Sequence, residues 1–144
     1  MKPSILAGLL CLVLYSGRSY AQTTKSDPQM KEFILLVRVP VTYGGEQAKV
    51  VNPQWNKVLD KWKADNVFVT SFVFPTESYV LSGADRTVKK EMVISDGLKV
   101  VSSIILHARS LENAVELAKA CPVLAYGGTV ECREVWPRTV QPAN

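Results

Sequence analysis

The sequence of 144 residues is poor in the side chains that usually carry chemistry. It contains one histidine, His107, and three cysteines. Its net charge of +4 is not gathered into any block of like charge. Nucleic-acid binding would need a basic stripe or patch, so we expect no nucleic-acid partner. The chain also lacks internal repeats and low-complexity segments, and its length suggests a single domain.

A hydrophobic run long enough to span a bilayer comfortably is also missing. The longest apolar stretch, Ile5–Tyr15, has about the length of a signal-peptide core. Lys2 precedes it, and Ser19-Tyr20-Ala21 places small residues where a signal peptidase cleaves. We therefore predict that residues 1–21 are a signal peptide and that the protein is exported, either periplasmic or secreted, without a membrane anchor. An uncleaved anchor is the less favoured alternative, because the run is short.

Cysteine is scarce in the predicted mature chain, where only Cys121 and Cys132 remain. Two cysteines do not make a disulfide scaffold, although an exported protein meets an oxidising environment that allows a bond. Each cysteine continues an apolar stripe on its own element, so we predict two unlinked thiols that point into the core. The spacing of these cysteines and His107 matches no compact zinc motif, and we expect neither a metal nor a cofactor.

The remaining sequence divides into a polar leader (22–29), a domain (30–137) and a short tail (138–144). Alternating and periodic apolar residues within the domain predict four main strands, two helices and a weaker strand pair. The main strands are expected at 31–39, 67–74, 98–108 and 129–135, the helices at 52–65 and 110–121, and the weaker pair at 78–81 and 87–94. Asn52, with Pro53 in the first turn, and Ser110 are the expected helix N-caps.

Three of the expected strands, at 31–39, 67–74 and 98–108, carry apolar side chains on both faces. In 31–39, one face holds Phe33, Leu35, Val37 and Val39, and the other holds Ile34, Leu36 and Arg38. In 98–108, we expect Val100, Ile104 and Leu106 to face one way and Val101 and Ile105 the other. Strands of this kind are covered on both faces.

The order of elements is β, α, β, a hairpin, β, α, β, which is the pattern of a ferredoxin-like split βαβ fold. The fold class is therefore α+β, a ferredoxin-like sandwich with a β-hairpin insertion. Two helices cover only one face of such a sheet. A second copy of the chain is the simplest cover for the other face, which predicts a homodimer built as a dimeric α+β barrel.

The first helix carries two tryptophans at helical spacing, Trp55 and Trp62. Together with Val58 and Leu59 they form a single apolar stripe. A ligand-binding aromatic box is one interpretation. Core packing is the favoured one, because the stripe falls where an amphipathic helix needs apolar residues.

The C-terminal half, HARSLENAVELAKACPVLAYGGTVECREV, resembles the YCII-related family, also known as the DGPF type. The similar positions are Ala108, Ser110 and Ala114, then Cys121-Pro122, Gly127-Gly128 and Glu131–Glu134. The start MKEFILLVRVP is also similar, so the resemblance covers about residues 30–135. It implies a dimeric α+β barrel of undefined activity. Some members of the family are suspected of catalysis through a His–Asp pair. Here the DGPF segment is reduced to Asp96-Gly97-Leu98-Lys99, and His107 has no family counterpart known to us, so that site is not carried over.

Four polar residues remain as candidates for a site. Arg38, Glu131 and Arg133 could bind a small anionic ligand in a dimer cleft, and His107 could act as a general base. The favoured alternatives are a salt bridge for the first three and an exposed or structural role for His107, which has no carboxylate near it in the sequence.

Three classes of function follow. A non-enzymatic exported dimer that binds a small ligand or a partner is preferred. A cryptic enzyme that uses His107 or the arginine–glutamate group is the alternative, and a purely structural accessory is the third. A pocket in which Arg38, Arg133 and His107 converge would favour binding or catalysis, whereas a closed apolar seam would favour the structural class.

Overall fold

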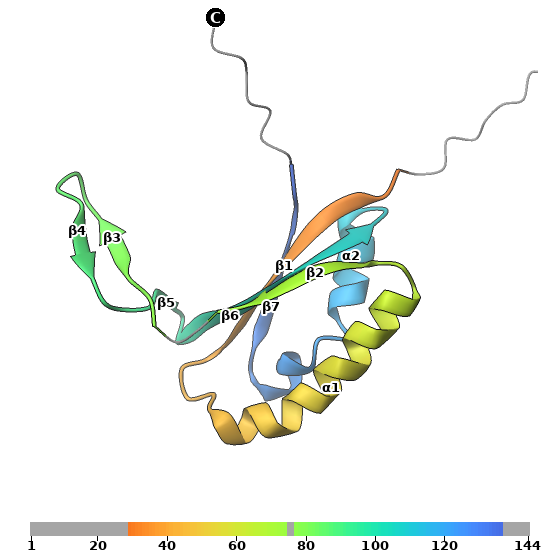
Figure 1. The fold of residues 1–144 in the computed structure, drawn as a ribbon, viewed down its shortest axis with the longest axis horizontal. Coiled ribbons are helices and arrows are strands. Elements are labelled where there is room, and N and C mark those ends of the chain that lie inside the picture. The colour runs from red at the N-terminus through yellow and green to blue at the C-terminus, as the bar shows by residue number, and fades with distance from the viewer. Residues whose placement is uncertain (1–28, 75–76, 137–144) are drawn as a thin grey trace, which may run out of the picture.

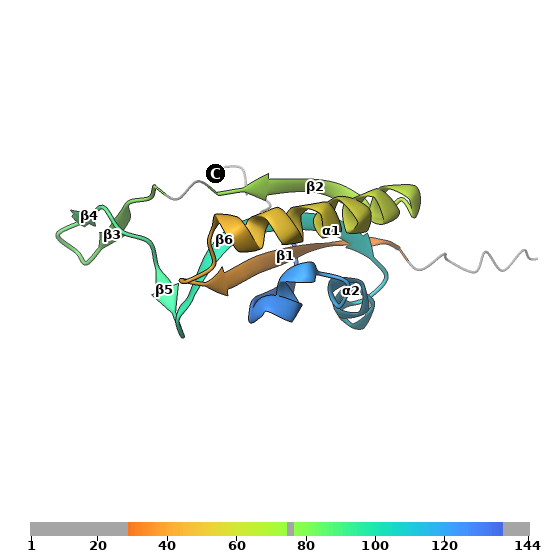
Figure 2. The ribbon, with the colours of Figure 1, turned by 90° about the horizontal axis from the view of Figure 1, so that it is seen from below.

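The computed structural model describes residues 29–74 and 77–136. The predicted signal peptide, most of the predicted leader and the predicted tail lie outside these residues. The elements are β1 (Lys31–Pro40), α1 (Gly45–Ala64), β2 (Phe68–Val73), β3 (Val80–Ser82), β4 (Thr87–Lys89), β5 (Ile94–Ser95), β6 (Leu98–Ala108), α2 (Leu111–Ala118), a 3₁₀ helix η1 (Pro122–Tyr126) and β7 (Thr129–Glu134). Figures 1 and 2 show both α-helices on the same side of the main sheet.

The main sheet is antiparallel, with the strand order β2-β6-β1-β7 and the short β5 paired to one end of β6. β1 and β6 are the central strands, as their apolar composition predicted. The protein is therefore an α+β domain with a mostly antiparallel sheet and two helices, and its strand order is compatible with a ferredoxin-like fold.

The hydrophobic core lies between the two helices and one face of the sheet, which we call the covered face. Phe33, Leu35, Val37 and Val39 of β1 are no more than 1% exposed there. Val51 and Trp62 of α1 pack into the same cluster. Fully burying one such side chain contributes about 1.5–3 kcal/mol. The alternation that predicted this face is thus confirmed for β1.

Helix α1 begins earlier than predicted. We expected a loop up to Val51 and a cap at Asn52, but the helix begins at Gly45, and Pro53 lies inside it. The side chain of Gln47 accepts a hydrogen bond from the backbone N–H of the N-cap residue Gly44 at 3.0 Å, so this donor has a partner at the start of the helix. Val51 is fully buried, and its packing into the core stabilises the added turns despite the hydrogen bond that Pro53 cannot donate.

A bulge in β6 changes the predicted faces of that strand. Val37 pairs with Ser102, whereas Arg38 pairs with Val100, so Val101 is an extra residue. Val100 therefore shares a face with Arg38 and not, as predicted, with Ile104 and Leu106. The period-two alternation was broken by one inserted residue, which the sequence pattern does not reveal.

The predicted hairpin insertion forms a second, two-stranded sheet of β3 and β4. Figure 1 shows it projecting away from the main sheet as an arm, residues 77–93. Four large apolar side chains of the arm are more than half exposed: Tyr79, Leu81, Val88 and Val93. Neither α-helix of the described residues has the length and apolar character needed to cross a membrane.

Candidate functional site

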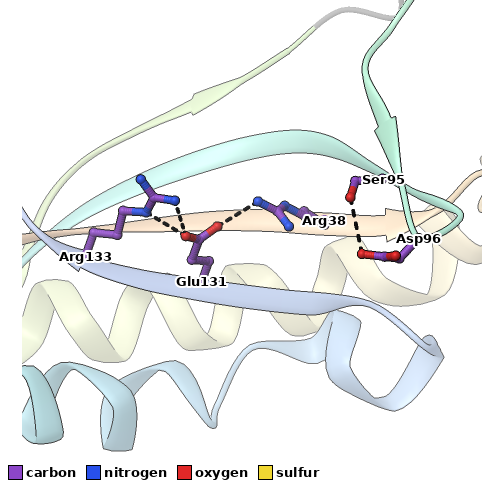
Figure 3. A network of polar contacts seen from close by, with 5 residues as sticks. All are labelled: Arg38, Ser95, Asp96, Glu131 and Arg133. Atoms are coloured by element: carbon purple, nitrogen blue, oxygen red, sulfur yellow. Dashed lines mark hydrogen bonds and ion pairs between the residues drawn. The ribbon is translucent and has the colours of Figure 1, made fainter.

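The predicted polar cluster is assembled in the structure from β1 and β7. Glu131 lies between the two arginines, as Figure 3 shows. Arg38 Nη2 donates to Glu131 Oε2 at 2.7 Å, and Arg133 Nε donates to Glu131 Oε1 at 2.6 Å. A second nitrogen of Arg133, Nη2, also pairs with Oε1. These three residues therefore form salt bridges with one another, which is the interpretation that the sequence favoured.

The pairing of β1 with β7 places this cluster on the face of the sheet opposite to the helices, which we call the open face. Leu36 pairs with Glu131, and Arg38 pairs with Thr129. The turn before β7 is tight, because a Cβ at Gly128 would lie 2.7 Å from the carbonyl oxygen of Arg38. Glycine at this position allows β7 to lie against β1 and so brings Glu131 to Arg38.

Two guanidinium groups share one carboxylate in this cluster, which leaves one positive charge in excess. The side chains of Arg38 and Glu131 are each 31% exposed, and that of Arg133 is 63% exposed. Salt bridges this open to water contribute little to stability. The cluster could receive an anion at Arg133, but its principal hydrogen-bonding capacity is already used by Glu131.

His107 does not join this cluster. It pairs with Glu32 near the other end of β1, and its Nε2 lies 3.7 Å from Glu32 Oε1. This distance is too long for a hydrogen bond. Glu32 is far from His107 in the sequence, but the antiparallel pairing of β1 with β6 brings its carboxylate near the imidazole. His107 remains a half-exposed side chain at the end of the sheet, and within the described residues no hydrogen bond or ion pair joins it to Arg38 or Arg133.

Cys121 and Cys132, the cysteines within the described residues, are free thiols, as predicted. Cys121 is buried in the core, and Cys132 pairs with Leu35, which places it toward the covered face. Burial and, to a smaller extent, the nearby Cys132 together raise the pKa of Cys121 to about 12. Burial also raises the pKa of Cys132. Both thiols are therefore protonated at neutral pH and are poor nucleophiles.

A cavity lies elsewhere, between α1 and the covered face of the sheet. Its volume is about 640 Å³, which is within the range of small-molecule sites. Its lining comprises Val37, Val39, Tyr43, Ala48, Asn52, Trp55, Asn56, Leu59, Ser71, Phe72, Val73, Val101, Ser102, Ile104 and Val123. The deepest part is formed by buried β-strand side chains such as Val37, Val39 and Ile104.

Polar groups in the lining come from two sides of this cavity. Asn52 and Asn56 lie one turn apart on α1 and are exposed, and Ser71 and Ser102 come from neighbouring strands. Burial raises the pKa of Tyr43, and Tyr126 nearby raises it further, so its hydroxyl stays neutral over the physiological range. The site therefore combines apolar walls with uncharged hydrogen-bonding groups.

Sequence reasoning missed this cavity, although some of its signals were present. Trp62 packs in the core as predicted, but Trp55 is only half-buried and lines the cavity as well as packing against the core. Ser102, a small side chain in a strand of larger apolar residues, also lines the cavity. Asn52 was interpreted only as a helix cap.

Within residues 29–74 and 77–136, no three histidine, cysteine or acidic side chains are grouped closely enough to hold a metal ion.

Comparisons of the chain with protein-family models and with curated proteins found no match.

Proposed function

We propose that this protein is an exported homodimer that binds a small molecule and does not catalyse a reaction. The observation that supports ligand binding is the cavity of about 640 Å³ between α1 and the covered face. A concave, mostly apolar site with a few hydrogen-bonding groups is the usual form of a small-molecule site. Its lining offers amides and hydroxyls, and a nucleophile paired with a base is not among the described lining residues.

The homodimer is proposed from the open face of the sheet. Ile34, Leu36 and Ile105 on the two central strands are only partly buried in the single chain, although they are large and apolar. Packing the open faces of two copies together would remove these side chains from water. We also propose that the fold is ferredoxin-like, on the strand order, and that two copies form a dimeric α+β barrel. A relation to the YCII-related family is proposed on the sequence resemblance alone.

Ligand binding can be tested with two fluorescent dyes that report transfer into an apolar site. The uncharged N-phenyl-1-naphthylamine and the anionic 1-anilinonaphthalene-8-sulfonate would be titrated into the folded protein. We expect saturable binding of at least one dye with about one site per chain. The variant Ala48→Phe places a ring in the cavity lining and should abolish binding. Ala64→Phe, at the exposed end of the same helix, is the matched control and should bind normally.

Failure of both dyes to bind a protein that melts cooperatively would contradict the proposal. Binding that survives Ala48→Phe would place the dye outside this cavity and would also contradict it.

The dimer can be tested by light scattering after size exclusion. We expect the mass of two chains for the wild type and of one chain for Leu36→Asp, which puts a charge in the open face. Leu81→Asp changes a side chain of the arm that is 66% exposed and should leave the dimer intact. A wild-type mass of one chain at micromolar concentration would contradict this part of the proposal.

A further inference from the structure

We propose that the ligand of the α1–sheet cavity is an uncharged molecule with an apolar body and one neutral hydrogen-bonding group. This inference rests on the proposed binding function and adds the chemical class of the ligand. It differs from the small anionic ligand that the sequence offered as a possible partner of Arg38, Glu131 and Arg133 on the open face. Three features of the cavity carry it: the charge of its walls, the positions of the nearest ionic groups, and the placement of its polar side chains.

The walls of the cavity carry no ionic group among the described residues. The 15 side chains that line it include no lysine, arginine, histidine, aspartate or glutamate. Its inner wall consists of Val37, Val39, Ile104 and Val123, which are no more than 3% exposed. An ionised ligand group placed against this wall would lose its hydration without gaining an opposite charge, which is strongly unfavourable.

No charged residue of the described neighbouring elements lines the cavity, although Lys99 of β6 pairs with the lining residue Val39 and so lies on the covered face. On β1, Val37 and Val39 line the cavity, and Arg38 between them therefore points to the open face, where Glu131 binds it. On α1, Lys49 pairs with Glu46 and Lys61 pairs with Asp65 at the surface. The excess positive charge of the arginine cluster is thus separated from the cavity by the sheet itself.

The polar side chains of the cavity indicate where a ligand's own polar group would lie. Asn52 and Asn56 are exposed on α1, and each amide can both donate and accept. The neutral hydroxyl of Tyr43 belongs to the same lining. A hydroxyl, carbonyl or amide of the ligand could bind at this rim while the apolar body lies against the inner wall.

The two dyes named above separate this class from an anionic ligand, because they share one aromatic skeleton and differ by a single sulfonate. We expect the uncharged dye to bind at least about tenfold more tightly, because the sulfonate would be desolvated without a partner. Asn56→Arg adds a cation to the lining and should strengthen binding of the sulfonate dye by several-fold. Val50→Arg adds the same charge to α1 at a residue outside the lining and is the matched control, which should not.

The outcomes distinguish this inference from the function on which it rests. Equal or tighter binding of the sulfonate dye by the wild type, blocked by Ala48→Phe, would leave the proposed function standing and overturn the uncharged class. Binding of neither dye to the folded protein would overturn both. An equal gain in sulfonate binding by Asn56→Arg and Val50→Arg would show that the charge acts at long range and would overturn the assignment of the polar group to this rim.

Discussion

The two faces of the sheet differ in their surroundings more than in their side chains. On β1 the covered face holds Phe33, Leu35, Val37 and Val39, all essentially inaccessible to water. The open face of the same strand holds Ile34, Leu36 and Arg38, all partly accessible. Leu35 and Leu36, neighbours of the same residue type, thus have different roles, because only one face is packed against helices. Mutations on the two faces should accordingly act on different properties, stability on one and association on the other.

The largest effect is expected for a truncation on the covered face. Leu35→Ala removes a fully buried side chain and should lower the free energy of unfolding by about 2–5 kcal/mol. Urea denaturation measures this directly.

Leu36→Ala, at the next residue, tests the comparison between faces. Its cost to the single chain should be within about 1 kcal/mol, measured at concentrations where the dimer has dissociated. Similar losses for the two variants in the single chain would show that the faces are equally packed.

The second prediction concerns the two thiols on the covered side of the sheet, of which Cys121 is buried and Cys132 is partly buried. At pH 8 the thiolate fraction of Cys121, with its pKa raised to about 12, should be about 10³-fold below that of a free thiol. Cys132 is more accessible and should react first with a thiol reagent in the folded protein. Time-resolved mass mapping would measure both rates, and faster labelling of Cys121 would contradict the packing described above.

Burial of Cys121 also has a consequence for stability at alkaline pH. The unfolded thiol ionises near pH 8.5, whereas the folded thiol remains neutral up to about pH 12. The stabilisation is therefore complete below about pH 8.5 and is lost as the pH rises toward 12. Cys121→Ala should show a smaller alkaline loss in denaturation experiments over this range.

A third and intermediate effect is expected at the turn that brings β7 to β1. Gly128→Ala would place a Cβ 2.7 Å from the carbonyl oxygen of Arg38 and 2.9 Å from Val123. Overpacking of this kind costs about 1–3 kcal/mol, which thermal melting would detect. Gly45→Ala is the control, because its added methyl meets nothing within 4 Å. Equal destabilisation of the two variants would show that close approach at Gly128 is not the cause.

A smaller effect is expected for the polar cluster of the open face. Glu131→Gln weakens the ion pairs to Arg38 and Arg133 and should cost less than about 1 kcal/mol, since all three groups are partly in water. The loss should shrink further in high salt. A cost of several kcal/mol in the single chain would contradict the description of this face as open.

The smallest effect is expected for His107. His107→Gln should change stability by no more than about 0.5 kcal/mol and should leave dye binding unchanged, because the side chain is half-exposed and lies outside the cavity lining. Loss of ligand binding with a normal melting temperature would show that His107 has a functional role.

Local sequence patterns were sufficient for most elements. Alternation on β1 identified its buried residues, and Ser110 caps α2 by accepting a hydrogen bond from the N–H of Asn113 at 3.2 Å. The predicted bounds of β6 agree with the structure at both ends. These features depend on interactions between residues near one another in the chain or on a regular period. The start of α1 was wrong, because its first turns depend on burying Val51 in a distant core.

The sites depended on the tertiary structure. The residues of the arginine cluster could be named from the sequence, but only the β1–β7 register showed that Glu131 lies between them on the open face. The cavity combines side chains from α1, β1, β2, β6 and η1, and one bulge in β6 turns Val101 into it. Composition and periodicity report which side chains are apolar and how often they recur. They contain no information on the gap left between distant elements, because that gap depends on how the elements pack in three dimensions.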